Sequence, residues 1–184
     1  MATKIKTYPA YVIMVVVILL DQLTKILTRN STAEGDSFAV LPQLFGDTFR
    51  FTHLSNTGAA FSFSLGNPAW NRVFFISATV VAVIFVLYLL YQATHRIQVI
   101  AFGLVLGGAI GNNLIDRLIY GQVTDFIDVD FPDFIMTRWP VFNVADSAIF
   151  IAMGLLIFSL IFLPDKRKPE ADPKVSLNDN NDNN

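Results

Sequence analysis

Residues 141–164 read VFNVADSAIFIAMGLLIFSLIFLP. From Ser147 to Pro164 the segment is free of charge, and its length lies within the about 17–25 residues that a helix needs to cross a bilayer. Asn143 and Asp146 stand at its beginning. An ionisable side chain inside such a helix costs roughly 2.5–3.5 kcal/mol at the centre, so it usually marks a function or a buried pair. The stretch therefore predicts a membrane helix with a polar site at its entrance.

The composition of the whole chain supports the membrane class. The chain has 184 residues, 53% of them hydrophobic, and a mean hydropathy of +0.51. It contains no cysteine, which excludes thiol catalysis, disulfides and cysteine metal sites. The histidines, His53 and His95, lie far apart in sequence, so we expect no histidine-rich metal site. The net charge of −2 is too small to indicate a nucleic-acid partner, and we expect none.

Three further uncharged runs lie at residues 7–20, 73–94 and 97–115. The first is long enough for a membrane helix only if Asp21 and Lys25 lie at its far end. A cleaved secretory signal is the alternative for this run, although Asp21 and Lys25 follow where small residues would be expected. We predict an all-α integral membrane protein, a single domain of residues 1–165 with four transmembrane helices at about 8–27, 72–93, 97–119 and 143–164.

An even number of crossings places both ends of the chain on one side. Seven of the 13 basic residues fall on that side, mostly on short flanks, which favours cytoplasmic termini. The connections 28–71 and 120–142 are then extracytoplasmic. TFRFTH (48–53) is a strand signal, and FPDFIMTRWP (131–140) suits a segment lying along the membrane surface. The polar tail, 166–184, is expected to be disordered and cytoplasmic.

The polar residues of the predicted helices are not scattered. They lie at the far end of the first helix, at the end of the third and just beyond it, and at the start of the fourth. In an antiparallel bundle these places meet at the same, outer, membrane face. The clustered residues are Asp21, Lys25, Asn112, Asp116, Arg117, Asp125, Asn143 and Asp146.

Several of these residues have structural explanations. Asp21 and Lys25 are four residues apart on one helical face, as are Asn112 and Asp116. For Asp21 and Lys25, a local ion pair that caps the helix end is as good an explanation as a functional role. Asp116 with Arg117 reads either as a structural pair or as an anchor at headgroup level. Glycines at 103, 107 and 111 repeat every fourth residue and predict close helix packing.

Asp125 and Asp146 lack a basic residue three or four positions away, so their nearest sensible partner is each other. Two adjacent carboxyls share one proton, which supplies an ionised base to activate water and an acid to polarise a carbonyl. A structural carboxyl pair is the alternative. A Ser–Lys dyad involving Lys25, and a phosphate loop at GGAIGN (107–112), fit less well. Outside enzymes, a proton pathway or transporter, or a membrane scaffold, remains open.

Five motifs in order carry a family resemblance: DQLTK (21–25), NTGAAF (56–61), GGAIGNNLIDR (107–117), VTDF (123–126) and FNVADS (142–147). The series resembles that of the bacterial lipoprotein signal peptidases, the type II signal peptidases, over residues 8–164. One departure is Thr124, where the family often has a second valine of similar volume. The insertion DVDFPDFIMTRWP, with Asp128, Asp130 and Asp133, is a second departure.

The resemblance implies an aspartyl endopeptidase of the bacterial cytoplasmic membrane that needs no metal or organic cofactor. Such enzymes remove signal peptides from diacylglyceryl-modified prolipoproteins, cutting before the lipidated cysteine at the outer leaflet. We expect these substrates and membrane lipids as partners, and a monomer. The resemblance also implies a small extracytoplasmic β-sheet cradle in the first connection and a short interfacial helix in the second. Its site residues are catalytic Asp125 and Asp146; orienting Asn56, Asn112, Arg117 and Asn143; and structural Asp21, beside Lys25 and Asp116.

Overall fold

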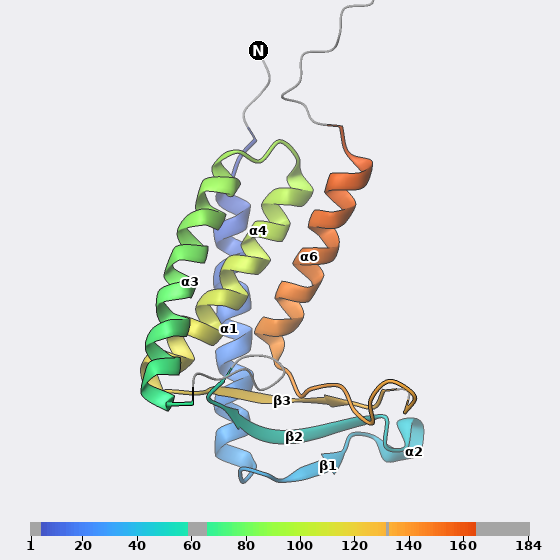
Figure 1. Ribbon diagram of the computed structural model, residues 1–184. Coiled ribbons are helices and arrows are strands. Elements are labelled where there is room, and N and C mark those ends of the chain that lie inside the picture. The colour runs from blue at the N-terminus through green and yellow to red at the C-terminus, as the bar shows by residue number, and fades with distance from the viewer. Residues whose placement is uncertain (1–4, 59–65, 132, 165–184) are drawn as a thin grey trace, which may run out of the picture.

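The structure, a computed structural model, describes residues 5–58, 66–131 and 133–164. Within these residues, four long helical spans lie side by side, and a small sheet covers one end of the bundle (Figure 1). The predicted set of four membrane-length helices is confirmed, since each span is long and apolar enough to cross a bilayer. The predicted tail, 166–184, lies outside the described residues. The spans are α1 (Tyr8–Ser31), α3 (Pro68–Tyr91), α4 (Arg96–Ala109) with its continuation, and α6 (Val144–Phe162).

The continuation of α4 changes its helical geometry. A π-helical segment, η2 (Ile110–Asp116), follows directly and leads into a short turn, α5 (Arg117–Ile119). A π-helical turn is wider than an α-helical one, and such turns are frequent at functional sites. Here it occupies the part of the span where the polar motif GNNLIDR begins. The polar side chains of the third span therefore leave the helix at a different spacing from the apolar ones above them.

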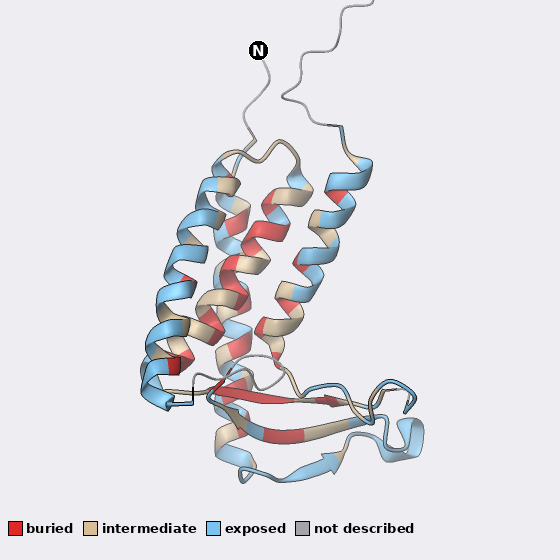
Figure 2. Ribbon diagram, in the orientation of Figure 1, coloured by how far each residue is buried: buried red, intermediate tan, exposed pale blue. Residues whose placement is uncertain are grey.

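Helix α4 is the centre of the bundle and packs against α1, α3 and α6. Figure 2 shows buried residues along α4, while the outer faces of α3 and α6 are exposed. Glycines permit the close packing. A Cβ on Gly103 would lie 2.7 Å from the carbonyl oxygen of Ala10, and one on Gly107 would lie 2.6 Å from the Cβ of Val17. The glycine stripe thus packs as predicted. The outward faces are apolar, which suits lipid rather than water.

The sheet lies at the end of the bundle opposite the two ends of the described chain (Figure 1). Its antiparallel strands, in the order β1-β2-β3, are β1 (Ser37–Ala39), β2 (Phe49–Asn56) and β3 (Val123–Val129). A one-turn helix, α2 (Pro42–Phe45), joins the first two. The pairing of β2 with β3 is irregular between Phe51 and Leu54, a bulge that re-aims the side chains beyond it. Leu54 then pairs with Asp125.

The second connection differs from expectation. The resemblance implied an interfacial helix there, but the described residues of 120–142 form β3, turns and an extended segment. Backbone hydrogen bonding explains this, because β3 pairs with β2 on one side, and Ile127 pairs with Phe142 on the other. The short helix of the sheet region is α2, in the first connection. The sheet is accordingly built from both connections rather than from the first alone.

Candidate active site

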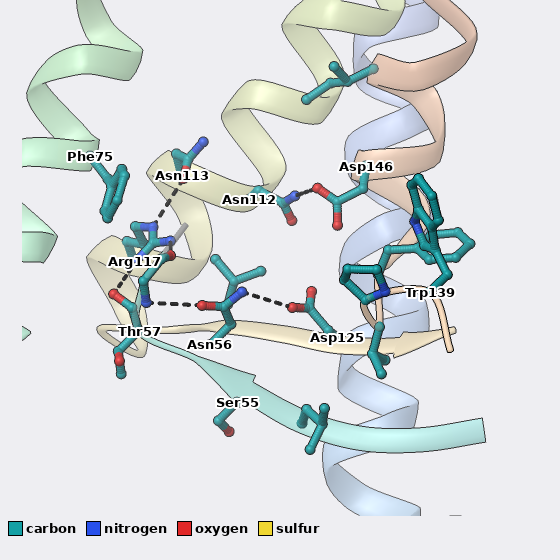
Figure 3. Close-up of a pocket in the computed structure, with 17 residues that line it drawn as sticks. Ser55, Asn56, Thr57, Phe75, Asn112, Asn113, Arg117, Asp125, Trp139 and Asp146 are labelled. Carbon is teal, nitrogen blue, oxygen red and sulfur yellow. Dashed lines mark hydrogen bonds between the residues drawn. The ribbon is translucent and has the colours of Figure 1, made fainter. Parts of the chain in front are cut away.

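A cavity of about 910 Å³ lies where the helices meet the sheet. Its lining comes from β2, η2, β3 and the start of α6, with apolar side chains of α3 and of the segment before α6. Asp125 and Asp146 both line it, and Figure 3 shows them on neighbouring elements, one on β3 and one on α6. The structure thus brings together two carboxyls that are 21 positions apart in the chain.

Asp125 is 5% exposed and receives hydrogen bonds from two carboxamides. Asn143 Nδ2 donates to its Oδ1 at 2.6 Å, and Asn56 Nδ2 donates to its Oδ2 at 3.3 Å. Burial, and next the negative charge of Asp146, raise the pKa of Asp125 to about 7. At neutral pH this carboxyl is therefore present in both its acid and its ionised form, whereas an aspartate with the ordinary pKa is ionised.

Asp146 lies in the first turn of α6 and has a different set of donors. Asn112 Nδ2 donates to its Oδ1 at 2.7 Å, and the backbone N–H of Asn143 donates to its Oδ2 at 3.2 Å. In return, Asn143 Oδ1 accepts from the backbone N–H of Asp146 at 3.0 Å. This reciprocal pair is a capping box, with Asn143 as the N-cap. The positive end of the helix dipole also favours a negative charge here.

The three carboxamides are held in one orientation each. In every case the oxygen accepts from a group that can only donate: Gly58 N–H for Asn56, the Lys25 ammonium for Asn112, and Asp146 N–H for Asn143. A flipped amide would place an NH₂ group against such a donor. The NH₂ groups must therefore face the carboxyls, and the cavity contains two carboxyls with pre-oriented N–H donors.

Lys25 is the centre of a fully buried ionic cluster. Its Nζ lies 2.8 Å from Asp21 Oδ2 and 2.7 Å from Asp116 Oδ2, and it donates to Asn112 Oδ1 at 2.5 Å. Asp21 also accepts from the backbone N–H of Ala145 at 3.0 Å, which fixes the start of α6. The Asp21–Lys25 ion pair, one of the explanations left open by the sequence, does form. Asp116 pairs with Lys25, so the alternative of an Asp116–Arg117 pair is not what forms.

Arg117 is buried and contacts the first connection rather than a carboxylate. Its guanidinium donates to the carbonyl oxygens of Thr57, at 3.1 Å, and of Gly58, and its Nε donates to Asn113. It lies over the ring of Phe75, 4.5 Å from the centroid. Figure 3 shows this group on the side of the cavity away from Asp146. Arg117 therefore holds the backbone next to Asn56, and through it the donor to Asp125.

A family model described as signal peptidase (SPase) II matches residues 13–162. The chain belongs to the signal peptidase II family. The resemblance read from the motifs is thus confirmed, and the chain is a peptidase. A lipoprotein signal peptidase of Serratia marcescens is 41% identical over 157 residues, which cover 85% of this chain and 86% of that protein. One from Janthinobacterium sp. (strain Marseille) is 44% identical over 144 residues, covering 78% and 82%.

Two solved structures have a similar fold. A bacterial membrane enzyme determined by the in meso method at 2.3 Å resolution has a TM-score of 0.74 and 30% identity. The match covers 92% of this signal peptidase II chain and 99% of that one. A second such structure, at 1.9 Å resolution, has a TM-score of 0.72 and 32% identity, with coverage of 89% and 99%. With its four apolar spans, this family member is a multi-pass membrane protein.

Some residues around the site were not predicted. Gln22 donates to Asp116 at 2.9 Å, and Asn113 accepts from Arg117 at 3.0 Å. Gln22 lies in the motif DQLTK and Asn113 in GGAIGNNLIDR, each next to a residue that we predicted for the site. Both are polar residues within a membrane span, and this property could have identified them. Thr57 and Gly58 act through backbone carbonyls, which no side-chain pattern reveals. Within the described ranges, no group of three or more His, Asp or Glu is placed to hold a metal.

Proposed function

We propose that this chain is an aspartyl endopeptidase that removes the signal peptide from diacylglyceryl-modified prolipoproteins. The observation that carries the proposal is the pair Asp125 and Asp146 in one cavity, each held by oriented amide donors. The names of the relatives, lipoprotein signal peptidases, support the substrate class. A proton pathway is less favoured, because the polar cluster gathers at the sheet end of the bundle rather than at its middle.

In this proposal Asp125 carries the shared proton and Asp146 is the ionised base. Amide N–H groups donate to both carboxyls, but Asp146 also has a backbone N–H and a helix N-terminus beside it, and both favour negative charge. The pKa of Asp125 is raised to about 7 by burial and by Asp146, which favours its acid form. The pair titrates as a unit, and repulsion between its members keeps one proton in the cavity.

The reaction needs only these groups and water. Asp146 takes a proton from water as the oxygen attacks the scissile carbonyl carbon, and Asp125 gives its proton to the carbonyl oxygen. The tetrahedral intermediate then collapses. Asp146 gives its proton to the departing amine as the C–N bond breaks. One hydroxyl group of the intermediate returns its proton to Asp125 as the C=O bond re-forms. The peptide bond is hydrolysed to a carboxyl group and a free amine, and both aspartates regain their starting protonation.

The place of the cavity suits a substrate that is itself in the membrane. The cavity lies at one end of the spans, next to the sheet, so a signal helix alongside the bundle would bring its end to Asp146. We propose that both termini are cytoplasmic and that this end faces the outer leaflet of the bacterial inner membrane. The cut then falls before the lipidated cysteine. We propose that the peptidase acts as a monomer and without a metal or organic cofactor.

The test is cleavage of a diacylglyceryl-modified prolipoprotein by the purified protein in detergent or lipid. We expect a product that begins at the lipidated cysteine, no cleavage of the unmodified precursor, and full activity with a metal chelator present. Asp125→Asn and Asp146→Asn should each abolish turnover while the protein stays folded.

Asp36→Asn is the matched control, because this aspartate is exposed at the sheet and lies outside the cavity. It should keep full activity. Normal turnover by either Asp125→Asn or Asp146→Asn would overturn the assignment of the catalytic pair.

A further inference from the structure

Residues 138–142, called the strap below, lead from the loop after β3 to the start of α6. Trp139, Pro140, Val141 and Phe142 of the strap line the cavity. The strap has backbone hydrogen bonds to β3 at both of its ends. Trp139 N–H donates to the carbonyl oxygen of Val129 at 2.9 Å, and Phe142 N–H donates to that of Ile127 at 3.0 Å. The carbonyl oxygen of Phe142 accepts from the N–H groups of Phe126 and Ile127 at 3.0 and 2.7 Å. One wall of the cavity is therefore a single extended segment, and its position depends on what holds it to the sheet.

Arg138 begins the strap and joins it to two other parts of the chain. Its Nε donates to Asp128 Oδ1 at 2.6 Å, and its Nη1 lies 3.3 Å from Asp47 Oδ2. Both terminal nitrogens also donate to the backbone carbonyl oxygen of Asp47 at 3.3 Å. Asp128 belongs to β3 and Asp47 to the turn before β2. The planar guanidinium thus ties the strap to the sheet and to the first connection at once.

Asp128, the partner of Arg138 on β3, is itself held in a fixed position. Asp128 is 5% exposed, and its second carboxyl oxygen accepts from Thr52 Oγ1 at 2.7 Å. A buried carboxylate with both oxygens engaged keeps a fixed position, so it gives Arg138 a fixed partner. Asp47 is 63% exposed, so its ion pair with Arg138 holds the strap less strongly than the pair with Asp128 does. The clamp residues are Arg138, Asp128 and Asp47.

Trp139 follows Arg138 directly and presents its ring to the cavity. The ring packs on that of Phe131, with centroids 5.1 Å apart, and the residue is 37% exposed. Figure 3 shows Trp139 on the side of the cavity opposite Arg117. An aromatic side chain half open to a cavity offers apolar surface to whatever enters it. Its direction is set by the strap backbone on either side, and hence by the clamp.

We propose that Arg138 is a positioning residue: its clamp to Asp128 and Asp47 holds the strap so that Trp139 forms the wall on which the substrate packs. This inference rests on the proposed function. Arg138 contacts neither carboxyl of the pair, so its loss removes binding that is equal in the ground and transition states. The expected signature is a higher KM with kcat preserved.

The kinetic test compares Arg138→Gln with Arg50→Gln, using the diacylglyceryl-modified prolipoprotein. Arg50 is the matched control because it also pairs with Asp47, at 2.5 Å, while its other side-chain hydrogen bonds go to Ser37 of β1 and not to the strap. We expect Arg138→Gln to raise KM about three- to tenfold, which is the range for the net loss of a typical hydrogen bond, with kcat little changed. Arg50→Gln should leave both near wild type. Arg138→Lys retains the positive charge but not the several N–H donors of the planar guanidinium, so its KM should lie between those of the wild type and Arg138→Gln.

A spectroscopic test does not need turnover. In a Trp70→Phe background, Trp139 is the remaining tryptophan of the sequence, and its quenching by acrylamide reports how open it is. We expect stronger quenching in Arg138→Gln than in Arg50→Gln. That result would hold even if the wild-type protein cleaved no prolipoprotein, so it separates this inference from the proposed function.

Three outcomes would overturn the proposal. They are equal quenching in the two variants, unchanged KM in Arg138→Gln despite altered quenching, and a loss of kcat with KM unchanged. If Arg138→Gln does not fold, Arg138→Lys carries both measurements, and wild-type values of KM and quenching in that variant would count against the clamp.

Discussion

Replacement of Lys25 by methionine tests the ionic cluster behind the site. Methionine has similar length but no charge, so Asp21 and Asp116 would face each other without the ammonium that lies 2.8 and 2.7 Å from them. All three side chains are fully buried. Removing one partner of a buried pair costs about 3–5 kcal/mol, a large part of the roughly 5–15 kcal/mol that holds a typical domain folded. We expect a clear fall in the unfolding temperature in detergent.

The same change should lower activity in the protein that remains folded. Asn112 Oδ1 would lose its donor, and the amide would be free to turn its oxygen toward Asp146. A misorientation worth about 1.4 kcal/mol in the transition state lowers kcat tenfold. Activity measured below the new unfolding temperature separates this effect from loss of folded protein.

Two comparisons make the Lys25 experiment decisive. Arg29→Met, one turn further along α1, removes a cation that contacts Thr124 and the ring of Tyr120 instead of a carboxylate. It should destabilise the protein less. Adding Asp116→Asn to Lys25→Met removes one uncompensated carboxylate and should recover about 0.5–3 kcal/mol. If Lys25→Met is no less stable than Arg29→Met, or the double variant recovers nothing, the buried cluster does not have the role described.

Four further predictions concern the pair and the packing. Activity should fall as pH rises through about 7, because Asp125 then loses the proton it donates. The free energy of unfolding should also fall between about pH 4 and 7, since folded Asp125 holds a proton that the unfolded chain has released, and a pH titration of Asp125→Asn should show a smaller slope. Asp146→Asn should lower the pKa of Asp125, measured by carboxyl NMR, because the repelling charge is gone. Asn143→Ala should reduce kcat on the order of 100-fold and cost about 1 kcal/mol as a lost N-cap, by kinetics and thermal unfolding. Gly108→Ala should cost about 1–3 kcal/mol by thermal unfolding, because its Cβ would lie 2.6 Å from Ala145 O, whereas Gly154→Ala, with nothing within 4 Å, should not.

The helices and the meeting of the two carboxyls could be predicted because membrane physics leaves few choices. An uncharged run of sufficient length is expected to form a helix, since a helix is the structure that satisfies the backbone of a single segment in lipid. Antiparallel spans then bring the far end of one run next to the near end of another. Asp146, at the start of the fourth span, and Asp125, just after the third, are placed at the same end by topology alone.

The donors that orient the carboxyls were only partly predictable. Asn56, Asn112 and Asn143 came from the motifs, but the direction of each amide depends on the group that holds its oxygen. Two of those groups are backbone N–H donors, and the third is Lys25, 87 positions from Asn112. A backbone donor has no residue type to recognise, and a long-range contact has no local pattern. The link from Lys25 through Asn112 to Asp146 therefore required the structure.

The strand β3 was missed for a related reason. A half-buried strand shows alternation of apolar and polar residues, but Val123–Phe126 are all buried because the strand has a neighbour on each side and helices above. With polar Asp125 and Asp128 among the buried residues, the segment has no apolar period. The segment that composition placed along the membrane surface, 131–140, lies beyond this strand. The pairing that decides the matter is with β2 and the strap, which lie elsewhere in the sequence.

The side chains that donate hydrogen bonds to Asp125 and Asp146 are uncharged carboxamides. A cation in direct contact with Asp125 would favour its ionised form and remove the acid that the proposed mechanism needs. Lys25 is instead paired with two carboxylates, and its hydrogen bond reaches Asp146 only through the carboxamide of Asn112. Asn143 likewise donates to Asp125 without a charge. The carboxamides transmit orientation from charged and backbone groups to the carboxyls while carrying no net charge themselves, so burial and mutual repulsion can keep one proton between the two aspartates.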